Sequence, residues 1–435
     1  MCEDTMKLFQ RLLVAPAALG LMAPLAANAD VSPVSTESDF SSEVIQARVD
    51  GLESQLGEVM AGQFSSSTKL SGKAAFITGY VDNNAATSSD EITFEYMYQL
   101  NLNTSFTGED NLYTRIKSGN VGDASGTVGH FVDKGQGTYL SAANSNNNAV
   151  KVDKLWYQFP VGDSMTVWVG PKIENYYMLA SAPSIYKPVT KQFALGGNGS
   201  AYGSSTSPGF GAAWTQEVED PSAARWAVSA NYSAKSGDNS AENKGLFGDD
   251  TESFVLTKVE YGSPRWQVSL ATSFKEGWDN DGYYQSALAT KSPNVAADSS
   301  MTAYAVRGYW RPETSGSVPE VQVGYDWATI DGAAAGEAED TSGWMVGLGW
   351  KDLFIDGNRA GIALGSRQAA TGLKSGGTVT SDPEEDNSVW EAYYTFKVND
   401  GVSITPAIFG GSDLTNASGT VTDVDGAVLL TEFRF

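Results

Sequence analysis

The stretch EITFEYMYQLNLNTSF, residues 91–106, alternates between apolar and polar side chains with a period of two. Its even positions carry Ile, Phe, Tyr, Leu or Thr, and its odd positions carry Glu, Thr, Gln, Asn or Ser, with Met97 as the exception. Successive side chains of a β-strand point to opposite faces, so this stretch predicts one long strand with an apolar and a polar face. The turn at 108–111 and the alternating run 112–117 predict its hairpin partner.

The same pattern recurs along the rest of the chain. Counting a first strand over 69–81, we expect sixteen strands, of which the last ends at Phe435. Short turns alternate strictly with longer polar loops, and the third of these loops, at about 173–209, is the longest. An even strand number with this alternation favours a closed antiparallel barrel over residues 70–435, because closure leaves no unpaired strand edge.

Strands of this kind bury their apolar face either in a soluble sandwich or propeller, or against lipid. Here the apolar face is rich in Tyr and Trp, as the girdles at membrane interfaces are. The opposite face carries Arg, Lys, Glu, Gln and Asn, which a dry core would accommodate only at high cost. We therefore predict an all-β, sixteen-stranded antiparallel transmembrane β-barrel around a water-filled lumen. No segment after residue 29 approaches the length of a spanning helix.

The composition excludes several classes of function. The chain has 435 residues and a formal net charge of −24, which argues against a nucleic-acid partner, because phosphates require a basic surface. The single cysteine, Cys2, lies in a segment that we expect to be removed, so disulfides and cysteine-based metal sites are excluded. The single histidine, His130, lies among glycines in a loop. We expect no catalytic residues, no cofactor and no metal site, and hence no enzyme.

The N-terminal part has a different character. Residues 1–29 match a secretory signal peptide, with Met1 and Met6 as alternative starts, and residues 30–39 read as a linker. Residues 40–64 predict a periplasmic coiled-coil helix, because apolar side chains are spaced at alternating intervals of four and three. This seam consists of Ile45, Val49, Leu52, Leu56 and Val59. Two interpretations stay open: a single helix docked on the barrel, or a trimerising stalk.

The chain resembles the cyanobacterial outer-membrane porins, a family related to the carbohydrate-selective and iron-uptake porins. The resemblance rests on the seam at 45–59, on DKLWYQFP at 153–160 with its partner TVWVG at 166–170, and on the terminal residues 433–435. Many members carry a surface-layer-homology domain before the coiled coil, and this chain has only residues 30–39 in that interval.

The resemblance implies a homotrimer in the outer membrane of a Gram-negative-type cell, reached by Sec-dependent export, through which small hydrophilic solutes pass. Phe433 and Phe435 resemble the aromatic C-terminal signal that the barrel-assembly machinery reads. We also expect contacts with outer-membrane lipid and lipopolysaccharide.

The third long loop is expected to fold into the lumen and narrow it. Its candidate constriction residues are basic or aromatic, accompanied by a single acid, Glu174: Lys172, Tyr176, Tyr177, Tyr186, Lys187 and Lys191. Strand alternation directs further bases to the lumen wall: Arg115, Lys117, Lys258, Arg307, Arg367 and Lys397. Trp156 and Trp168 also fall on the inward register. The alternative for the loop is a solvated surface segment without a role.

Positive charge in a narrow pore of low dielectric constant suggests a weak preference for anions, with phosphate-like or carboxylate solutes held by Lys and Arg. The rival hypothesis is attraction of cations by the acidic outer loops, and stacking of sugar rings on the loop tyrosines is a third. We expect passive diffusion of inorganic ions or sugars. The alternative function is an envelope-anchoring protein with little conductance.

Overall fold

The computed structural model describes most of the predicted barrel. The described residues are 67–82, 91–122, 131–132, 137–144, 146–197, 200–203, 206–277, 299–376, 386–415 and 421–435. The predicted signal peptide, linker and coiled-coil seam all lie outside these ranges. Within them, no helix has the length and apolar character needed to cross a membrane.

The described residues form strands of 5 to 15 residues and two single-turn 3₁₀ helices. The strands are β1 (Thr68–Asp82), β2 (Thr93–Thr104), β3 (Asn111–Gly119), β4 (Lys151–Val161), β5 (Met165–Ile173), β6 (Ser207–Thr215), β7 (Arg225–Ala234), β8 (Ser253–Ser263), β9 (Trp266–Glu276), β10 (Ser300–Trp310), β11 (Glu320–Asp331), β12 (Ala338–Lys351), β13 (Arg359–Gly365), β14 (Ala369–Leu373), β15 (Ser388–Lys397), β16 (Val402–Thr415) and β17 (Val421–Arg434). The 3₁₀ helices are η1 (Asn175–Tyr177) and η2 (Lys191–Phe193), both between β5 and β6.

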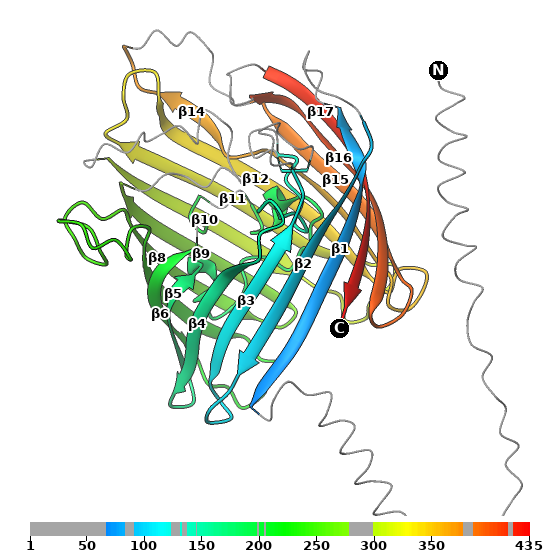
Figure 1. The fold of residues 1–435 in the computed structure, drawn as a ribbon, viewed down its shortest axis with the longest axis horizontal. Helices are drawn as coiled ribbons and strands as arrows, with labels where there is room; N and C mark the ends of the chain where they lie inside the picture. The colour runs from blue at the N-terminus through cyan, green and yellow to red at the C-terminus, as the bar shows by residue number, and fades with distance from the viewer. Residues whose placement is uncertain are drawn as a thin grey trace, which may run out of the picture. The chain divides into compact units, whose positions relative to one another are not determined.

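All strand pairings are antiparallel, and the sheet closes where β1 pairs with both β2 and β17 (Figure 1). β13 and β14 occupy one position in the barrel, because both pair with β12, and residues 366–368 interrupt them. The barrel therefore has sixteen strand positions, as the sequence predicts. The prediction of a strict alternation between short and long connections is wrong. β12 and β17 begin early, which leaves only residues 332–337 and 416–420 at two of the long-loop positions.

The two faces of the sheet differ as the period of two predicts. On β9, Trp266, Val268 and Leu270 are exposed, whereas the alternating residues Ser269 and Ala271 are buried inside the barrel. The exposed side chains therefore form an apolar outer surface, while the other face of each strand points to the interior.

Aromatic side chains form bands on this outer surface. Near the short turns, the ring of Tyr261 lies 4.7 Å from that of Trp226 and 5.7 Å from that of Trp266. Near the long loops, Tyr304 stacks on Trp327 with their ring centroids 5.1 Å apart. Two aromatic bands that flank an apolar belt are typical of a barrel that faces lipid.

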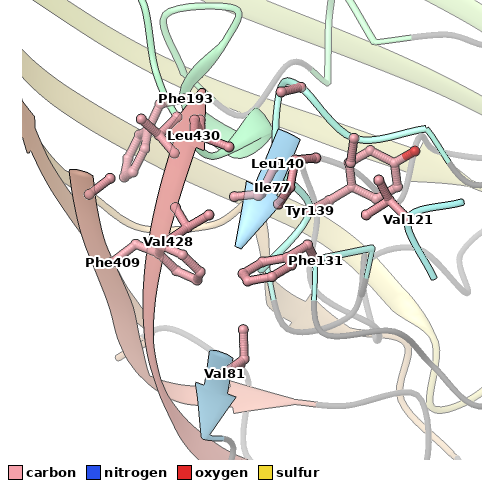
Figure 2. Packing of buried hydrophobic residues seen from close by; sticks show 14 of the residues in the cluster. Ile77, Val81, Val121, Phe131, Tyr139, Leu140, Phe193, Phe409, Val428 and Leu430 are labelled. Carbon is pink, nitrogen blue, oxygen red and sulfur yellow. The ribbon is translucent and has the colours of Figure 1, made fainter. Parts of the chain in front are cut away.

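The long-loop half of the interior is packed with apolar side chains. Figure 2 shows Phe131, from the β3–β4 connection, among Ile77 of β1, Phe409 of β16 and Val428 of β17. Phe193, from the β5–β6 connection, joins the same buried cluster. Two loops therefore fold into the barrel and cover the inner faces of the strands there. From the sequence, this inward fold is expected only for the loop between β5 and β6.

A second buried cluster covers the inner face of β8 to β12. Leu195 and Tyr202 of the β5–β6 connection pack against small side chains of the wall, including Ala303 and Ala305 of β10 and Ala328 of β11. Because alanine leaves room for an approaching segment, these positions let the loop lie flat against the wall. The lumen near the long loops is therefore narrowed by packed chain.

Candidate functional site: the inward loop and the cavity beneath it

The β5–β6 connection, residues 174–206, begins at the β4–β7 side of the barrel. Glu174 forms an ion pair with Lys154, a buried residue on the inner face of β4. Next to it, the side-chain amide of Asn231 on β7 donates hydrogen bonds to the carbonyl oxygens of Asn175 and Met178, at 3.0 and 3.4 Å. Burial in the barrel strengthens such polar contacts, so the first turn of the loop is fixed to the wall.

The loop then runs along β7 and β8. The backbone N–H of Ala180 donates to Ser229 Oγ on β7 at 2.9 Å. Ser181 Oγ lies 2.8 Å from both Lys258 Nζ and Glu260 Oε2 on β8, and these two buried side chains also form an ion pair. These two charged wall residues therefore neutralise each other and both bind the Ser181 side chain of the loop.

The loop reaches the far wall at Glu391, a fully buried residue of β15. Its carboxylate accepts four hydrogen bonds from the loop: from Tyr186 Oη at 2.9 Å, Val189 N at 3.1 Å, Thr190 N at 2.8 Å and Thr190 Oγ1 at 2.5 Å. Tyr393, two residues along β15, donates to the Lys187 carbonyl oxygen at 2.7 Å. Residues 186–190 are therefore fastened to one strand by five hydrogen bonds, which leaves them little freedom to move.

The returning part of the loop is held at β10 and β11. Arg307 Nε donates to the Leu195 carbonyl oxygen at 2.9 Å, and Arg307 also forms a buried ion pair of 2.8 Å with Asp326. Gly324 of β11 lies so close to the Gly196 carbonyl oxygen that a Cβ atom at position 324 would overlap it. The wall therefore holds the loop by specific contacts at β4 and β7, at β8, at β15 and at β10 and β11.

Beneath the loop lies a cavity of about 610 Å³, toward the short-turn end of the barrel. Its roof includes residues 187–189 of the loop and residues 141–142 of the β3–β4 connection. Its floor includes the turns at 352–357 and 399–401, and its sides belong to β1, β13, β15, β16 and β17. The volume falls in the range of about 300–1,000 Å³ that is common for small-molecule sites.

The cavity is lined by more bases than acids. The bases are Lys73, Lys187, Lys351, Arg359, Lys397 and Arg434, and the acids are Asp352, Asp400 and Glu432. Four of the bases have carboxylate partners: Lys73 and Arg434 pair with Glu432, Lys397 pairs with Asp400, and Lys351 pairs with Glu320. Among the described residues, no ion pair joins Lys187 or Arg359 to a carboxylate.

Lys187 is surrounded by positive charge. Burial within the barrel lowers the pKa of its ammonium group, and the charges of Arg359, Arg311 and Lys351 lower it further, while Glu320 acts in the opposite direction. Glu320, the acid that acts on Lys187, already forms ion pairs with Lys351 at 2.6 Å and with Arg311 at 3.2 Å. Arg359 exerts the strongest of these charge effects on Lys187, so the two cations share one part of the cavity.

The constriction residues expected from the sequence are placed in different surroundings. Tyr186 is buried against Glu391, Lys187 reaches the cavity, and Tyr176 and Tyr177 pack on each other with centroids 5.0 Å apart. The Lys191 ammonium lies 5.6 Å from the centre of the Tyr139 ring. Lys172 is exposed and in register with Leu155, because a bulge between 170 and 173 shifts the alternation.

Most of the expected wall cations contact the loops. Arg115 donates to Tyr177 Oη at 3.3 Å, Lys117 donates to the Ala143 carbonyl oxygen at 3.3 Å, and Lys258 and Arg307 bind the loop as described above. Arg367 is fully buried where β13 gives way to β14, and its backbone N–H donates to Asn387. Lys397 is exposed and lines the cavity. These cations therefore serve mainly to fix the loops.

The inward register of Trp156 and Trp168 has a structural explanation. Trp156 lies 5.0 Å from Tyr113 and 6.5 Å from Tyr177, measured between ring centroids, and Trp168 is buried in the same cluster. Both indoles therefore support the start of the inward loop.

Sequence reasoning missed several residues that build the site. Lys154 escaped notice because a bulge in β4 interrupts the alternation beside it. The period of two is consistent with an inward Glu391, but nothing in the sequence connects this residue to Tyr186, more than two hundred residues earlier in the chain. The same period is consistent with an inward Arg359, and only the fold shows that no carboxylate of the described residues pairs with it.

Comparison with known proteins also points to a transmembrane β-barrel. The model of the family described as carbohydrate-selective porin, OprB family, matches residues 35–409. An uncharacterized protein of Nostoc sp. is 27% identical over 411 residues, which cover 86% of this chain and 66% of that protein. An uncharacterized protein of Synechocystis sp. is 25% identical, covering 85% of this chain and 70% of that protein. The chain thus spans about two thirds of the length of these curated relatives.

Solved structures share the fold. OprB of Pseudomonas putida superposes with a TM-score of 0.54 at 12% identity and covers 85% of this chain and 94% of its own. Salmonella typhi OmpF, solved in complex with daunomycin, gives a TM-score of 0.56 at 13% identity, covering 85% and 97%. OmpT of Vibrio cholerae, solved in its trimer form, gives 0.51 at 10% identity, covering 85% and 100%.

Proposed function

Because the chain belongs to the carbohydrate-selective porin, OprB family, we propose that it is an outer-membrane porin through which small hydrophilic solutes, inorganic ions or sugars, diffuse passively. The observation that carries this proposal is the loop of residues 174–206, which lies inside a closed barrel and is fastened to its wall above a polar cavity of about 610 Å³. An apolar outer surface with aromatic bands suits an outer-membrane location.

The proposed channel selects by size and charge, with no catalytic step. Sixteen strands enclose an interior too wide for wall side chains alone to fill, so the passage is set by what the loops leave free. Because the loop is fixed at β8, β10 and β15, the constriction should be stable and independent of voltage. The loop's tyrosines Tyr176 and Tyr177 offer an aromatic surface for sugars as an alternative solute.

We further propose that the chain assembles as a homotrimer, with the residues 45–59 seam as its stalk and Phe433 and Phe435 as its assembly signal. A trimer form of a barrel of the same fold supports the first part. The ring of Phe435 stacks on Tyr98 with centroids 6.2 Å apart, and Phe433 packs on Phe76 at 5.1 Å, so both aromatic residues lie on the outer surface where the barrel closes. Chemical cross-linking of the full chain in detergent tests the oligomer.

A second candidate is an envelope-anchoring barrel with little conductance. The observation that favours it is the packing of two loops into apolar clusters over the inner faces of β1, β16, β17 and β8 to β12. Planar-bilayer recording of the purified protein separates the two candidates. Discrete, voltage-independent steps support the porin, whereas an electrically silent but folded barrel supports the anchor.

A further inference from the structure

The cations of the cavity differ in what they can offer a solute, because a charge that is already neutralised within the protein attracts a solute only weakly. Lys397 and Lys351 each have a carboxylate partner, at 2.8 and 2.6 Å. Lys187 and Arg359 both line the cavity with exposed side chains, and no carboxylate of the described residues lies within ion-pair distance of either. These two cations are therefore the ones available to a solute.

The two cations come from different parts of the fold and meet in one place. Lys187 belongs to the loop, where its carbonyl oxygen is held by Tyr393 and the adjacent Tyr186 is held by Glu391. Arg359 is the first residue of β13 and is in register with Thr395 of β15. Because both backbones are fixed, two like charges are held near each other, which is unfavourable unless an anion lies between them.

The surrounding lining suits an anion that also forms hydrogen bonds. Thr395 and Thr405 contribute hydroxyl groups that lie 2.9 Å apart, and Asn399 and Ser403 line the same cavity. A guanidinium group matches the oxygens of a phosphate in a two-pronged geometry, and an ammonium group adds a point charge. Two cations and several neutral hydrogen-bonding groups fit a doubly charged oxyanion better than they fit chloride.

We propose that Lys187 and Arg359 form a binding subsite for the phosphate group of a small solute, either inorganic phosphate or a sugar phosphate, on the short-turn side of the inward loop. This inference rests on the proposed porin function, since it names a solute class for the same channel. The loop that narrows the passage would also supply half of the subsite.

The test uses the full-length protein in detergent and in planar bilayers. Equilibrium dialysis measures binding of radiolabelled phosphate, and single-channel recording measures how phosphate alters the chloride current. The variants are Lys187→Gln and Arg359→Gln, which lie on different segments, so misfolding of one leaves the other as a test. Lys397→Gln is the matched control, because it removes the same unit of charge from the same cavity but from a residue paired with Asp400.

Each test variant should weaken phosphate binding at least about tenfold, equivalent to about 1.4 kcal/mol, whereas the control should stay within about twofold of the parent protein. Glucose 6-phosphate, inorganic phosphate and glucose are compared as competitors of the labelled phosphate. Stronger competition by glucose 6-phosphate identifies a sugar phosphate as the solute, equal competition identifies phosphate alone, and glucose should not compete.

Equal losses in Lys397→Gln and in the two test variants would overturn the subsite, because the effect would then reflect net charge alone. Absence of saturable phosphate binding by a conducting protein would also overturn it and leave the porin standing. Conversely, phosphate binding by a protein that never conducts would keep the subsite and reject the porin.

Discussion

Replacement of Glu391 tests whether the inward loop sets the passage. The carboxylate accepts four hydrogen bonds, two on each oxygen, from Tyr186, Val189 and Thr190. In Glu391→Gln, one oxygen becomes an amide NH₂ that donates. Whichever way the amide turns, one backbone N–H, of Val189 or of Thr190, loses its acceptor, whereas the hydroxyl beside it can turn and accept from the amide. A buried N–H left without an acceptor costs about 1–3 kcal/mol, so the docked loop should lose about that much.

This loss is large enough to change the population of the docked loop. At about 1.4 kcal/mol for each factor of ten, the ratio of docked to released loop should fall by about five- to a hundredfold. The contacts of Arg307 and Lys258 with the loop remain, so the release should be confined to the segment around residues 186–190. Residues on the strands keep their ladder hydrogen bonds, and the barrel itself should remain folded.

Two measurements can detect this release of the loop. Single-channel recordings of Glu391→Gln should show larger or noisier current steps than the parent protein. Trypsin should cleave after Lys191 much faster, because Lys191 N is held by the Tyr139 carbonyl oxygen at 2.7 Å in the docked loop. The control is Glu432→Gln, an inward carboxylate whose partners are the wall residues Lys73 and Arg434. Unchanged current and unchanged cleavage in a folded Glu391→Gln barrel would refute the reasoning.

Three further outcomes are expected. Gly324→Ala should destabilise the barrel by about 1–3 kcal/mol, because its Cβ atom would overlap the Gly196 carbonyl oxygen, and this loss should lower the melting temperature. The control Gly308→Ala should change the melting temperature little, since its Cβ atom would make only an ordinary contact at 3.4 Å. Anion preference, measured as a reversal potential, should fall with rising pH before it reaches about 10.4, the pKa of an exposed lysine, since the pKa of Lys187 is lowered and its charge is lost earlier. Lys187→Gln should make this fall smaller. Deletion of Phe435 should reduce the yield of heat-modifiable barrel on gels, whereas a normal yield would contradict its proposed part in assembly.

The strand order and the strand faces could be predicted from the sequence because each depends on local periodicity. The predicted hairpin of 91–106 with 112–117 is present, with Leu100 opposite Ile116 and Leu102 opposite Thr114. The exposure of Trp226 and Trp266 follows from the same alternation. A period of two fixes which face a side chain occupies, and hairpin turns fix its partner strand, so these features need no knowledge of distant contacts.

The loops could not be predicted in the same way, since irregular chain has no period and its contacts join positions far apart in the sequence. The inward register identified Lys258 and Arg307 as wall cations, but their loop partners, Ser181 and Leu195, lie in another connection. One weak signal was present. Alanines on the inward register of β9 to β11 left space that a sixteen-stranded barrel would otherwise fill with larger side chains or water.

Arginine side chains therefore have two roles in this lumen, and the presence or absence of a carboxylate partner separates the two roles. Arg307, paired with Asp326, can bind the loop carbonyl without leaving a net charge in the interior. Arg359 has no such carboxylate, and a second unpaired cation is fixed beside it by the hydrogen bonds of Glu391 and Tyr393 to the loop. If the hydrogen bonds between Glu391 and the loop were lost, Lys187 would move away from Arg359. The width of the passage and its affinity for phosphate would then change together. A Glu391→Gln protein that conducts more but binds phosphate as tightly as the parent would separate the two, and would show that the loop supplies the constriction without supplying the charge.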